Sequence, residues 1–242
     1  PAALELAERC GMLYRWRYEL RVPAPVRGRE GAALDALTLG TLFHRCMELL
    51  DFAQPQPAAA LVAQAAAEMD LDETTDLAAL SQELEEMLER FRSHELCSSI
   101  AGARRTYREM DFLMACGPAT LRGQIDLLYE DTEGRRYIVD YKSDRIGDEG
   151  PAPHAARYKL QMLLYAAAAA KHFRSPPTEA RLYFLRTGQV HTFVATDTSL
   201  AEAQERAASL AGELIRARRN GQFDRRETAL CDVCPYRTLC GR

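Results

Sequence analysis

Hydrophobic positions recur at helical spacing in several parts of the chain. The most regular stretch covers residues 38–51, with an apolar stripe at Leu39, Leu42, Phe43, Cys46, Met47 and Leu50. Similar spacing predicts helices over 2–20, broken at Cys10-Gly11, over 81–96 with Ser81 as N-cap, over 155–172, and over 199–220, where Ser199-x-x-Glu202 forms a capping box. Residues 54–80 are rich in Ala, Gln and acids, and we expect short helices on an outer face there.

Strand-forming residues occupy the middle of the chain, over 106–114, 121–130 and 135–142. The turn-forming sequence 131–134 joins the last two as a hairpin, and a second hairpin is predicted over 179–195 around Thr187-Gly188. The order is then helices, three strands, a helix, two strands and a helix. This order indicates a single α/β domain over 1–242, with a mainly helical part at 1–100, a core at 101–198, and a C-terminal helix and tail at 199–242.

Charged side chains stand at one end of the first hairpin. Asp126 lies in one strand, and Asp140 and Lys142 lie in the other. Because strand side chains alternate with a period of two, Asp140 and Lys142 project from the same face. An acid in such an apolar strand is costly to desolvate without compensation, so the pattern suggests a divalent metal and a cationic partner. Glu109 in the preceding strand is either a further carboxylate of this site or a surface charge on an edge strand.

Two helices carry polar residues that could face such a site. His44 lies about 130° from the centre of the apolar stripe, so it is either solvated or turned toward a site rather than buried in the core. In the helix over 155–172, Tyr158, Gln161 and Tyr165 fall within about 60° of one another, opposite the leucines. We expect the leucine face to pack on a sheet and leave the Tyr/Gln face to line a groove or to stay partly exposed.

The cysteines form a second signal. Cys231, Cys234 and Cys240 have the spacing C-x2-C-x5-C, and closely spaced thiolates select zinc or iron–sulfur clusters, which want a fourth ligand. Cys10 is the best candidate for that ligand, because the remaining three cysteines lie on an apolar helix face or lack ligand-like neighbours (Cys46, Cys97 and Cys116). Such a site would join the two ends of the chain.

Composition limits the function classes. The net charge of −4 excludes a generally basic surface for nucleic acid, although residues 1–29 carry six Arg against three Glu. No apolar run approaches the roughly 20 residues of a membrane span, and no secretory segment is recognisable, so we expect a cytoplasmic protein with no membrane partner. The chain starts at Pro1 without Met and contains no G-x-x-x-x-G-K-[ST] motif. We therefore expect these 242 residues to be part of a longer polypeptide and to contain no nucleotide-driven motor themselves.

Together these segments resemble a known family. The chain resembles the RecB-type nuclease domain of the PD-(D/E)XK superfamily in four segments, GTLFHRCMELL, GQID, VDYK and YKLQMLLYA, with Glu109 between the first two. These segments contain His44, Asp126, Asp140, Lys142, Gln161 and Tyr165. The tail C-x2-CPYR-x2-C with the upstream Cys10 resembles the iron–sulfur branch, as in AddB and the CRISPR adaptation nucleases. In this branch the upstream cysteine is usually followed by Pro, whereas Gly11 follows it here.

The resemblance implies a fold and a set of site residues. The expected fold is a restriction-endonuclease-like core, with a mixed central sheet flanked by helices. The implied ligands of Mg2+ or Mn2+ are His44, Asp126, Asp140 and the carbonyl of Tyr141. Lys142 would orient water or neutralise charge, and Glu109 is a further acid. Gln161 and Tyr165, with Tyr158 on the same helix face, would position the DNA backbone. A [4Fe–4S] cluster, or alternatively zinc, would be held by Cys10, Cys231, Cys234 and Cys240.

The implied activity is that of a metal-dependent deoxyribonuclease, most simply an exonuclease acting on single-stranded DNA ends. Its expected partner is a helicase region, in the same polypeptide or in a separate chain, in double-strand-break repair. Two alternatives stay open: a catalytically silent module that binds DNA ends, and a stand-alone exonuclease of the CRISPR adaptation type.

Overall fold

A five-stranded mixed sheet forms the centre of the computed structural model, which describes residues 1–23, 32–69, 77–227 and 230–240. The strands lie side by side in chain order: β1 (Arg105–Cys116), β2 (Ala119–Glu130), β3 (Arg136–Lys142), β4 (Glu179–Phe184) and β5 (Gln189–Val194). Only β3 and β4 pair in parallel, and the other neighbours are antiparallel. A parallel pair needs a crossover connection, which is supplied by α7 (Pro151–Ala155), η2 (Ala156–Tyr158) and α8 (Lys159–Phe173).

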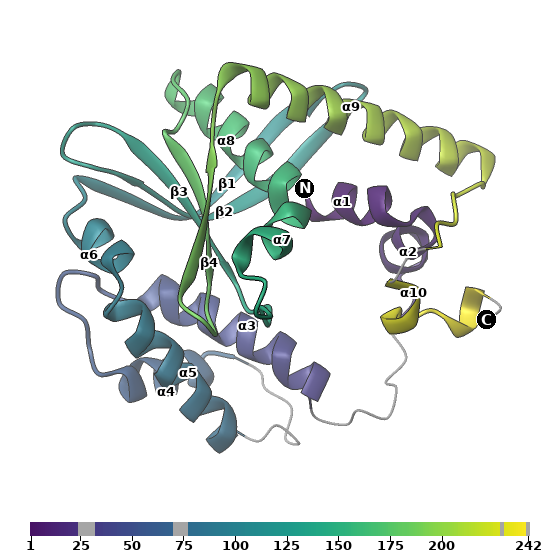
Figure 1. The fold of residues 1–242 in the computed structure, drawn as a ribbon. Coiled ribbons are helices and arrows are strands. Elements are labelled where there is room, and N and C mark those ends of the chain that lie inside the picture. Colours follow the sequence, from purple (N-terminus) through teal and green to yellow (C-terminus); the bar gives the residue numbers. More distant parts are fainter. Residues whose placement is uncertain (24–31, 70–76, 228–229, 241–242) are drawn as a thin grey trace.

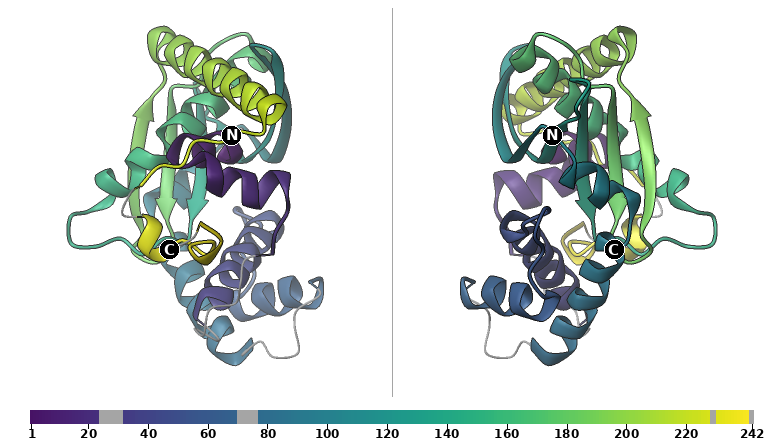
Figure 2. Two further views of the ribbon diagram at one scale, coloured as in Figure 1. Left: turned by 90° about the vertical axis from the view of Figure 1, so that its right-hand side faces the viewer. Right: turned by 90° about the vertical axis from the view of Figure 1, so that its left-hand side faces the viewer.

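Helices cover both faces of this sheet (Figures 1 and 2). One face carries α3 (Ala32–Leu49), α4 (Ala58–Ala67), α5 (Leu77–Arg92) and α6 (Glu95–Ala101); the other carries α1 (Ala2–Arg9), α8 and α9 (Asp197–Asn220). Neighbouring strand residues therefore enter different cores: Leu128 and Ile138 pack under α8 and α9, whereas Leu127 and Val139 pack toward α3 and α5. The predicted α/β class is confirmed.

The shorter elements lie near the two chain ends. They are α2 (Gly11–Tyr14), a π-helix η1 (Arg15–Glu19), α10 (Leu230–Val233) and the 3-10 helix η3 (Thr238–Cys240). The predicted break in the first helix is confirmed, because Cys10 has extended backbone with φ −164° and ψ 115° between α1 and α2. None of the helices in the described part of the chain has the length and apolar character that a membrane span requires.

Both predicted hairpins are present. Gly134 in the β2–β3 turn has φ +80°, and Gly188 in the β4–β5 turn has φ +70°. Glycine adopts this region without the steric cost of a Cβ atom, so these positions fix the two turns. Residues 70–76, which belong to the stretch where we predicted short helices, lie outside the described residues, as do residues 24–31.

Several predicted helix boundaries need correction. The helix expected over 38–51 is α3, which already begins at Ala32 and ends at Leu49. Ser81 is not an N-cap, because α5 begins at Leu77 and carries Ser81 in its interior. The capping box of α9 pairs Thr196 with Ser199 rather than Ser199 with Glu202, and the helix starts accordingly at Asp197. A cap depends on backbone entry geometry, which a four-residue motif does not fix.

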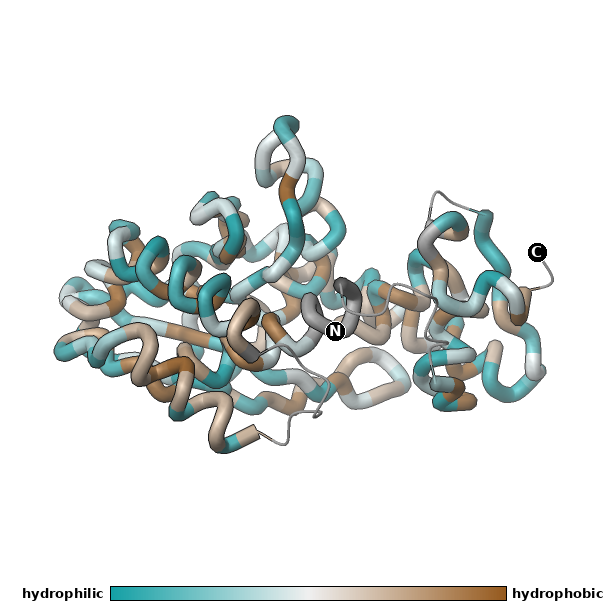
Figure 3. Tube along the Cα trace, turned by 90° about the horizontal axis from the view of Figure 1, so that it is seen from below, coloured by the Kyte–Doolittle hydropathy of each residue, from teal (hydrophilic) through white to brown (hydrophobic). Residues whose placement is uncertain are grey.

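Helix α4 belongs to the core more than its composition indicated. Leu61, Val62 and Ala65 are buried, and they pack in the same core as α3 and α5. Along the helices of Figure 3, brown hydrophobic positions recur between teal hydrophilic ones, as expected for elements with one buried side. The expectation of an outer face therefore holds only for the exposed side of α4.

Candidate metal centre

The strands β2 and β3 separate at Asp126. Their ladder ends at the pair Leu127–Val139, and the adjoining residue Asp126 has no partner in it. From there the Asp126 carboxylate continues the connection, because its Oδ2 accepts a hydrogen bond from the Tyr141 backbone N–H at 3.0 Å. The Asp126 side chain thus takes the place of a strand partner where the sheet opens, and this hydrogen bond fixes the position of its carboxylate.

Strand β1 is irregular at the position opposite Asp126. Glu109 has φ +47°, a left-handed conformation that is rare for a residue with a side chain. Tyr107 and Met110 pack against the same core, although residues three apart in a regular strand face opposite sides. The left-handed residue therefore changes which residues of β1 face each side of the sheet. Strained backbone of this kind tends to occur at functional sites.

His44, Glu109 and Asp126 come together from α3, β1 and β2. One potential ligand atom from each lies within 4.8 Å of the others, and the His44 Nδ1 is 3.6 Å from the Asp126 Oδ2. His44 is half-buried, with 33% of its side chain exposed, so it faces this group rather than the core or open solvent. Glu109 is likewise part of a cluster and not an isolated charge on an edge strand.

Burial and crowded negative charge shape the ionisation of this group. Burial, and then the nearby Asp140 carboxylate, raises the pKa of Asp126 well above its ordinary value. Burial, with the charges of Glu48 and Asp140 adding to it, raises the pKa of Glu109 to about 7. Burial lowers the pKa of His44 despite the opposing effect of Asp140, which favours the neutral imidazole that a metal requires. A divalent cation would relieve this repulsion, and oxygen donors with one imidazole suit Mg2+ or Mn2+.

The buried Asp140 forms an ion pair with the part-buried Lys142 beside these three residues. Asp140 is 1% exposed, and its Oδ2 lies 2.6 Å from the Lys142 Nζ, so the predicted common face of the strand is correct. Burial by itself would lower the pKa of Lys142, but the carboxylates of Asp140 and Asp126 outweigh it and raise that pKa. Lys142 is therefore held in its charged form.

The geometry differs in one respect from the ligand set that we predicted. Within the described residues, the compact three-residue group contains Glu109 in the place where we expected Asp140. Asp140 is instead engaged by Lys142 and by Gln161, whose Nε2 donates to Asp140 Oδ1 at 3.3 Å. The Tyr141 ring is buried against Phe43, and metal binding by its carbonyl stays a prediction.

The Tyr/Gln face of α8 is not open to a groove. Gln161 is 7% exposed and Tyr165 is 5% exposed, so the expectation is wrong for these two residues, whereas Tyr158 is partly exposed. Phe112 of β1 covers Tyr165 with its ring edge-on at 5.7 Å, while the Gln161 Nε2 donates to the Tyr165 hydroxyl at 2.7 Å. Tyr158 lies at the entrance of the helix with the Lys142 Nζ 4.8 Å from its ring centre. DNA positioning by these three residues stays a prediction.

Glu5 is a member of this neighbourhood that the sequence did not reveal. It lies on α1, is 8% exposed, and accepts a hydrogen bond through Oε1 from the Gln161 backbone N–H at 2.8 Å. Burial is the main cause that raises the pKa of Glu5 to about 7. The two residues are 156 positions apart, and no local pattern around Glu5 distinguishes it from a surface acid on an amphipathic helix.

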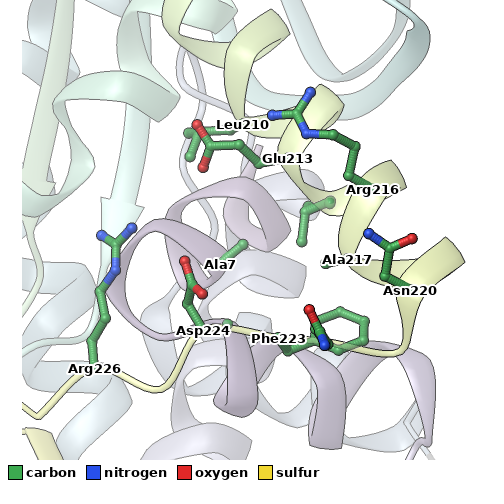
Figure 4. A pocket seen from close by; sticks show the side chains of 12 residues that line it. Ala7, Leu210, Glu213, Arg216, Ala217, Asn220, Phe223, Asp224 and Arg226 are labelled. Carbon is green, nitrogen blue, oxygen red and sulfur yellow. The ribbon is translucent and has the colours of Figure 1, made fainter.

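The two ends of the chain meet on another side of the molecule. The Met12 N–H donates to the Asp224 carbonyl at 3.1 Å, and a Cβ at Gly11 would lie 2.8 Å from that same oxygen. The close approach accounts for glycine after Cys10. Asp224 and Phe223 line a cavity between α1 and α9 with a volume of about 360 Å3. Figure 4 shows their side chains. This cavity contains none of the residues of the metal centre.

Four cysteines gather at this junction. Burial raises the pKa of Cys234, and the negative charges of Cys240, Cys10 and Cys231 add to the rise, so these three thiols lie close enough to affect Cys234. The Tyr236 hydroxyl also donates to the Val22 carbonyl at 2.8 Å. Cys46, which we predicted to be a core residue, is buried, and so are Cys97 and Cys116. No three thiols in the described residues come within 4.8 Å of one another.

The fold and the site define a class of protein. The sequence matches the PD-(D/E)XK nuclease superfamily over residues 1–241, and the chain belongs to this superfamily. Its five-stranded sheet with flanking helices is the corresponding restriction-endonuclease-like core. A solved structure from Eubacterium rectale, of a protein named for a proposed exonuclease activity, shares the fold with a TM-score of 0.59 at 16% identity, over 94% of this chain and 80% of that one.

The curated relatives are components of larger enzymes. The chain is 35% identical over 123 residues to an ATP-dependent helicase/nuclease subunit of Bacillus licheniformis, covering 43% of this chain and 10% of that protein. It is 28% identical over 189 residues to the protein of the same name from Bacillus cereus, covering 69% of this chain and 15% of that protein. The chain thus spans a small fraction of the length of these relatives. Neither relative carries the AddB name, and the AddB-like iron–sulfur assignment stays a prediction.

Proposed function

We propose that this chain is a deoxyribonuclease that uses Mg2+ or Mn2+ to hydrolyse phosphodiester bonds. The observation that carries the proposal is the convergence of His44, Glu109 and Asp126 beside the Asp140–Lys142 ion pair. These donors suit a hard divalent cation, and their crowding leaves negative charge that such a cation would balance. Membership of a nuclease superfamily supports the same chemistry.

The residues have distinct roles in this proposal. His44, Asp126 and Glu109 hold the metal, with Asp140 and the Tyr141 carbonyl as the further ligands that the sequence predicted. When bound, the metal polarises the scissile phosphate and makes an attacking water more acidic. Lys142 supplies a fixed positive charge that stabilises the negative charge developing on the phosphate. Asp140 keeps this ammonium group in place, with its Oδ2 2.6 Å from the Lys142 Nζ.

The proposal extends to the substrate and the setting of the enzyme. We infer an exonuclease that acts on single-stranded DNA ends in the cytoplasm, as the nuclease module of a helicase–nuclease in double-strand-break repair. Similarity to helicase/nuclease subunits, of which the chain matches 10% and 15%, supports this setting. A stand-alone exonuclease is the competing setting.

The catalytic proposal is tested with the Asp140→Ala variant on end-labelled single-stranded DNA in Mg2+. We expect the wild-type chain to degrade the DNA and the variant to be inactive, and EDTA to abolish wild-type cleavage. Asp148→Ala is the matched control, because Asp148 is an exposed acid eight residues further along the chain. Equal degradation by wild type and Asp140→Ala would overturn the assignment. Binding of DNA ends without cleavage by either protein would favour the silent binding module.

The cysteine cluster is a second, separate proposal. In this proposal a [4Fe–4S] cluster joins the chain ends and is held by Cys10, Cys231, Cys234 and Cys240. The effect of the other three thiols on the pKa of Cys234 supports this grouping. Anaerobically purified protein should then be brown, and Cys234→Ser should remove the visible absorbance. Cys97→Ala is the control, because Cys97 is buried in the core. Colourless protein with stoichiometric zinc would replace the cluster by the zinc alternative.

A further inference from the structure

Helix α8 begins without a capping side chain of its own. Its N-cap residue, Tyr158, makes no side-chain cap hydrogen bond. The first N–H groups of a helix have no partner within the helix. A capping side chain normally accepts a hydrogen bond from one of them, often from the N–H of the third helical residue, N3. Here that N–H belongs to Gln161, and it donates to Glu5 Oε1 of α1 at 2.8 Å. A carboxylate at this position also interacts favourably with the helix dipole.

Glu5 and Asp140 contact the same residue, Gln161. Glu5 accepts from its backbone N–H, and Asp140 accepts from its side-chain amide. The Gln161 Nε2 lies 3.3 Å from the Asp140 Oδ1 and 2.7 Å from the Tyr165 oxygen. The other Asp140 oxygen carries the Lys142 ammonium group. A continuous series of polar contacts therefore runs from Glu5 through Gln161 to Asp140 and Lys142.

We propose that Glu5 is a positioning residue for the nuclease site, which acts by fixing the first turn of α8 so that the Gln161 amide orients the Asp140–Lys142 pair. This inference rests on the proposed function, since it assigns Glu5 to the same reaction. It explains why an acid with 8% exposure stands on α1, where an apolar residue would avoid the cost of desolvation. A displacement of about 1 Å at reacting groups can lower the rate roughly 100-fold.

The charged groups around Glu5 agree with this arrangement. Lys142 favours its ionised form and Asp140 opposes it, and the Gln161 N–H stabilises the negative charge. Neighbouring Glu8 has a different environment, because its carboxylate pairs with Arg206 on the surface. Glu8→Gln is therefore a matched control on the same helix.

The hydrogen bond itself is tested by amide exchange, independently of cleavage. Glu5→Gln keeps an acceptor oxygen, whereas Glu5→Met has a similar size without one. We expect the Gln161 amide to exchange at least about 10-fold faster in Glu5→Met than in the wild type, and to stay protected in Glu5→Gln and in Glu8→Gln. Equal protection in Glu5→Met and the wild type would overturn the proposal.

The functional effect is tested by a double-mutant cycle with Gln161→Ala. We expect Glu5→Met to lower kcat by roughly 10-fold or more with little change in KM, and Glu5→Gln to recover activity to within about 3-fold of wild type. In the Gln161→Ala background, Glu5→Met should cause no further fall, because the route to Asp140 is already lost. Equal falls in both backgrounds would show a merely structural role and overturn the inference. Wild-type cleavage that depends on Asp140, measured beside these variants, separates this outcome from a failure of the proposed function.

Discussion

The Asp126 carboxylate replaces the strand partner of Tyr141, with its Oδ2 3.0 Å from the Tyr141 backbone nitrogen. The same oxygen lies 3.6 Å from the His44 Nδ1. One part-buried side chain therefore closes the sheet where β2 and β3 separate and also contributes to the candidate metal centre. Its structural and chemical roles can be separated by substitution.

Asp126→Asn and Asp126→Ala should differ in stability but not in metal binding. Asparagine keeps an oxygen that accepts from Tyr141 and removes a crowded charge, so the unfolding free energy of metal-free protein should not fall. Alanine leaves the buried N–H without this partner and should lower the unfolding free energy by about 1–3 kcal/mol. Both should weaken Mn2+ binding roughly 10-fold or more.

Urea denaturation and titration calorimetry with Mn2+ measure these two effects. Asp111→Asn serves as the control, since Asp111 is an exposed acid of β1. Unchanged Mn2+ affinity in Asp126→Asn would remove Asp126 from the ligand set.

Metal binding should stabilise the protein more at high pH than at low pH. Burial raises the pKa of Glu109 from 4.5 to about 7, so between these values the folded chain holds a proton that the unfolded chain releases. Stability without metal is therefore lost as pH rises through this window. A divalent cation competes with that proton, and its stabilising effect should grow from about pH 5.5 to about pH 8.

The measurement is the Tm with and without MnCl2 at both pH values. Glu109→Gln should reduce the pH dependence of the Mn2+ effect, because glutamine has no proton for the metal to displace. An Mn2+ effect that is the same at both pH values would argue against Glu109 as a ligand.

The Asp140–Lys142 pair should show strong coupling. Lys142→Met leaves Asp140, which is 1% exposed, as an unpaired buried charge. Breaking such a pair costs roughly 3–5 kcal/mol, whereas replacing both charges costs much less. The double variant Asp140→Asn/Lys142→Met should therefore be more stable than Lys142→Met alone in urea denaturation. Additive losses would show that the two charges do not depend on each other.

Glu5 should make the protein less stable as pH rises toward neutrality. Burial raises the pKa of Glu5 from 4.5 to about 7, so the folded chain retains a proton over that range and loses stability as the proton leaves. The contribution is at most about 1.4 kcal/mol per pH unit. Glu5→Gln should flatten the curve of unfolding free energy against pH over this window, while Glu8→Gln should follow the wild type. Parallel curves for Glu5→Gln and wild type would contradict the raised pKa.

Local pattern determined much of the fold. Glycines at 134 and 188 place the two hairpin turns, the apolar stripe of α3 sets which side of that helix is buried, and alternation along β3 places Asp140 and Lys142 on one face. These features depend on residues two to four positions apart, a range over which backbone geometry relates sequence directly to direction. Local pattern pointed to Asp126 and Asp140 as a site and left His44 and Glu109 open between a site and the surface; the resemblance to the nuclease family assigned all four to the site.

Tertiary packing decided how those candidates meet. Three features depend on which segments cover the strands and helices: the left-handed backbone of Glu109, the end of the β2–β3 ladder at Asp126, and the burial of Gln161. No short-range pattern in the sequence carries that information. The contact between Glu5 and Gln161 spans 156 positions. Sequence by itself thus determined the elements and the chemistry that each can offer. Only the packed structure decided that α1 supplies the missing cap of α8, because the two helices meet only where the sheet holds both on one face.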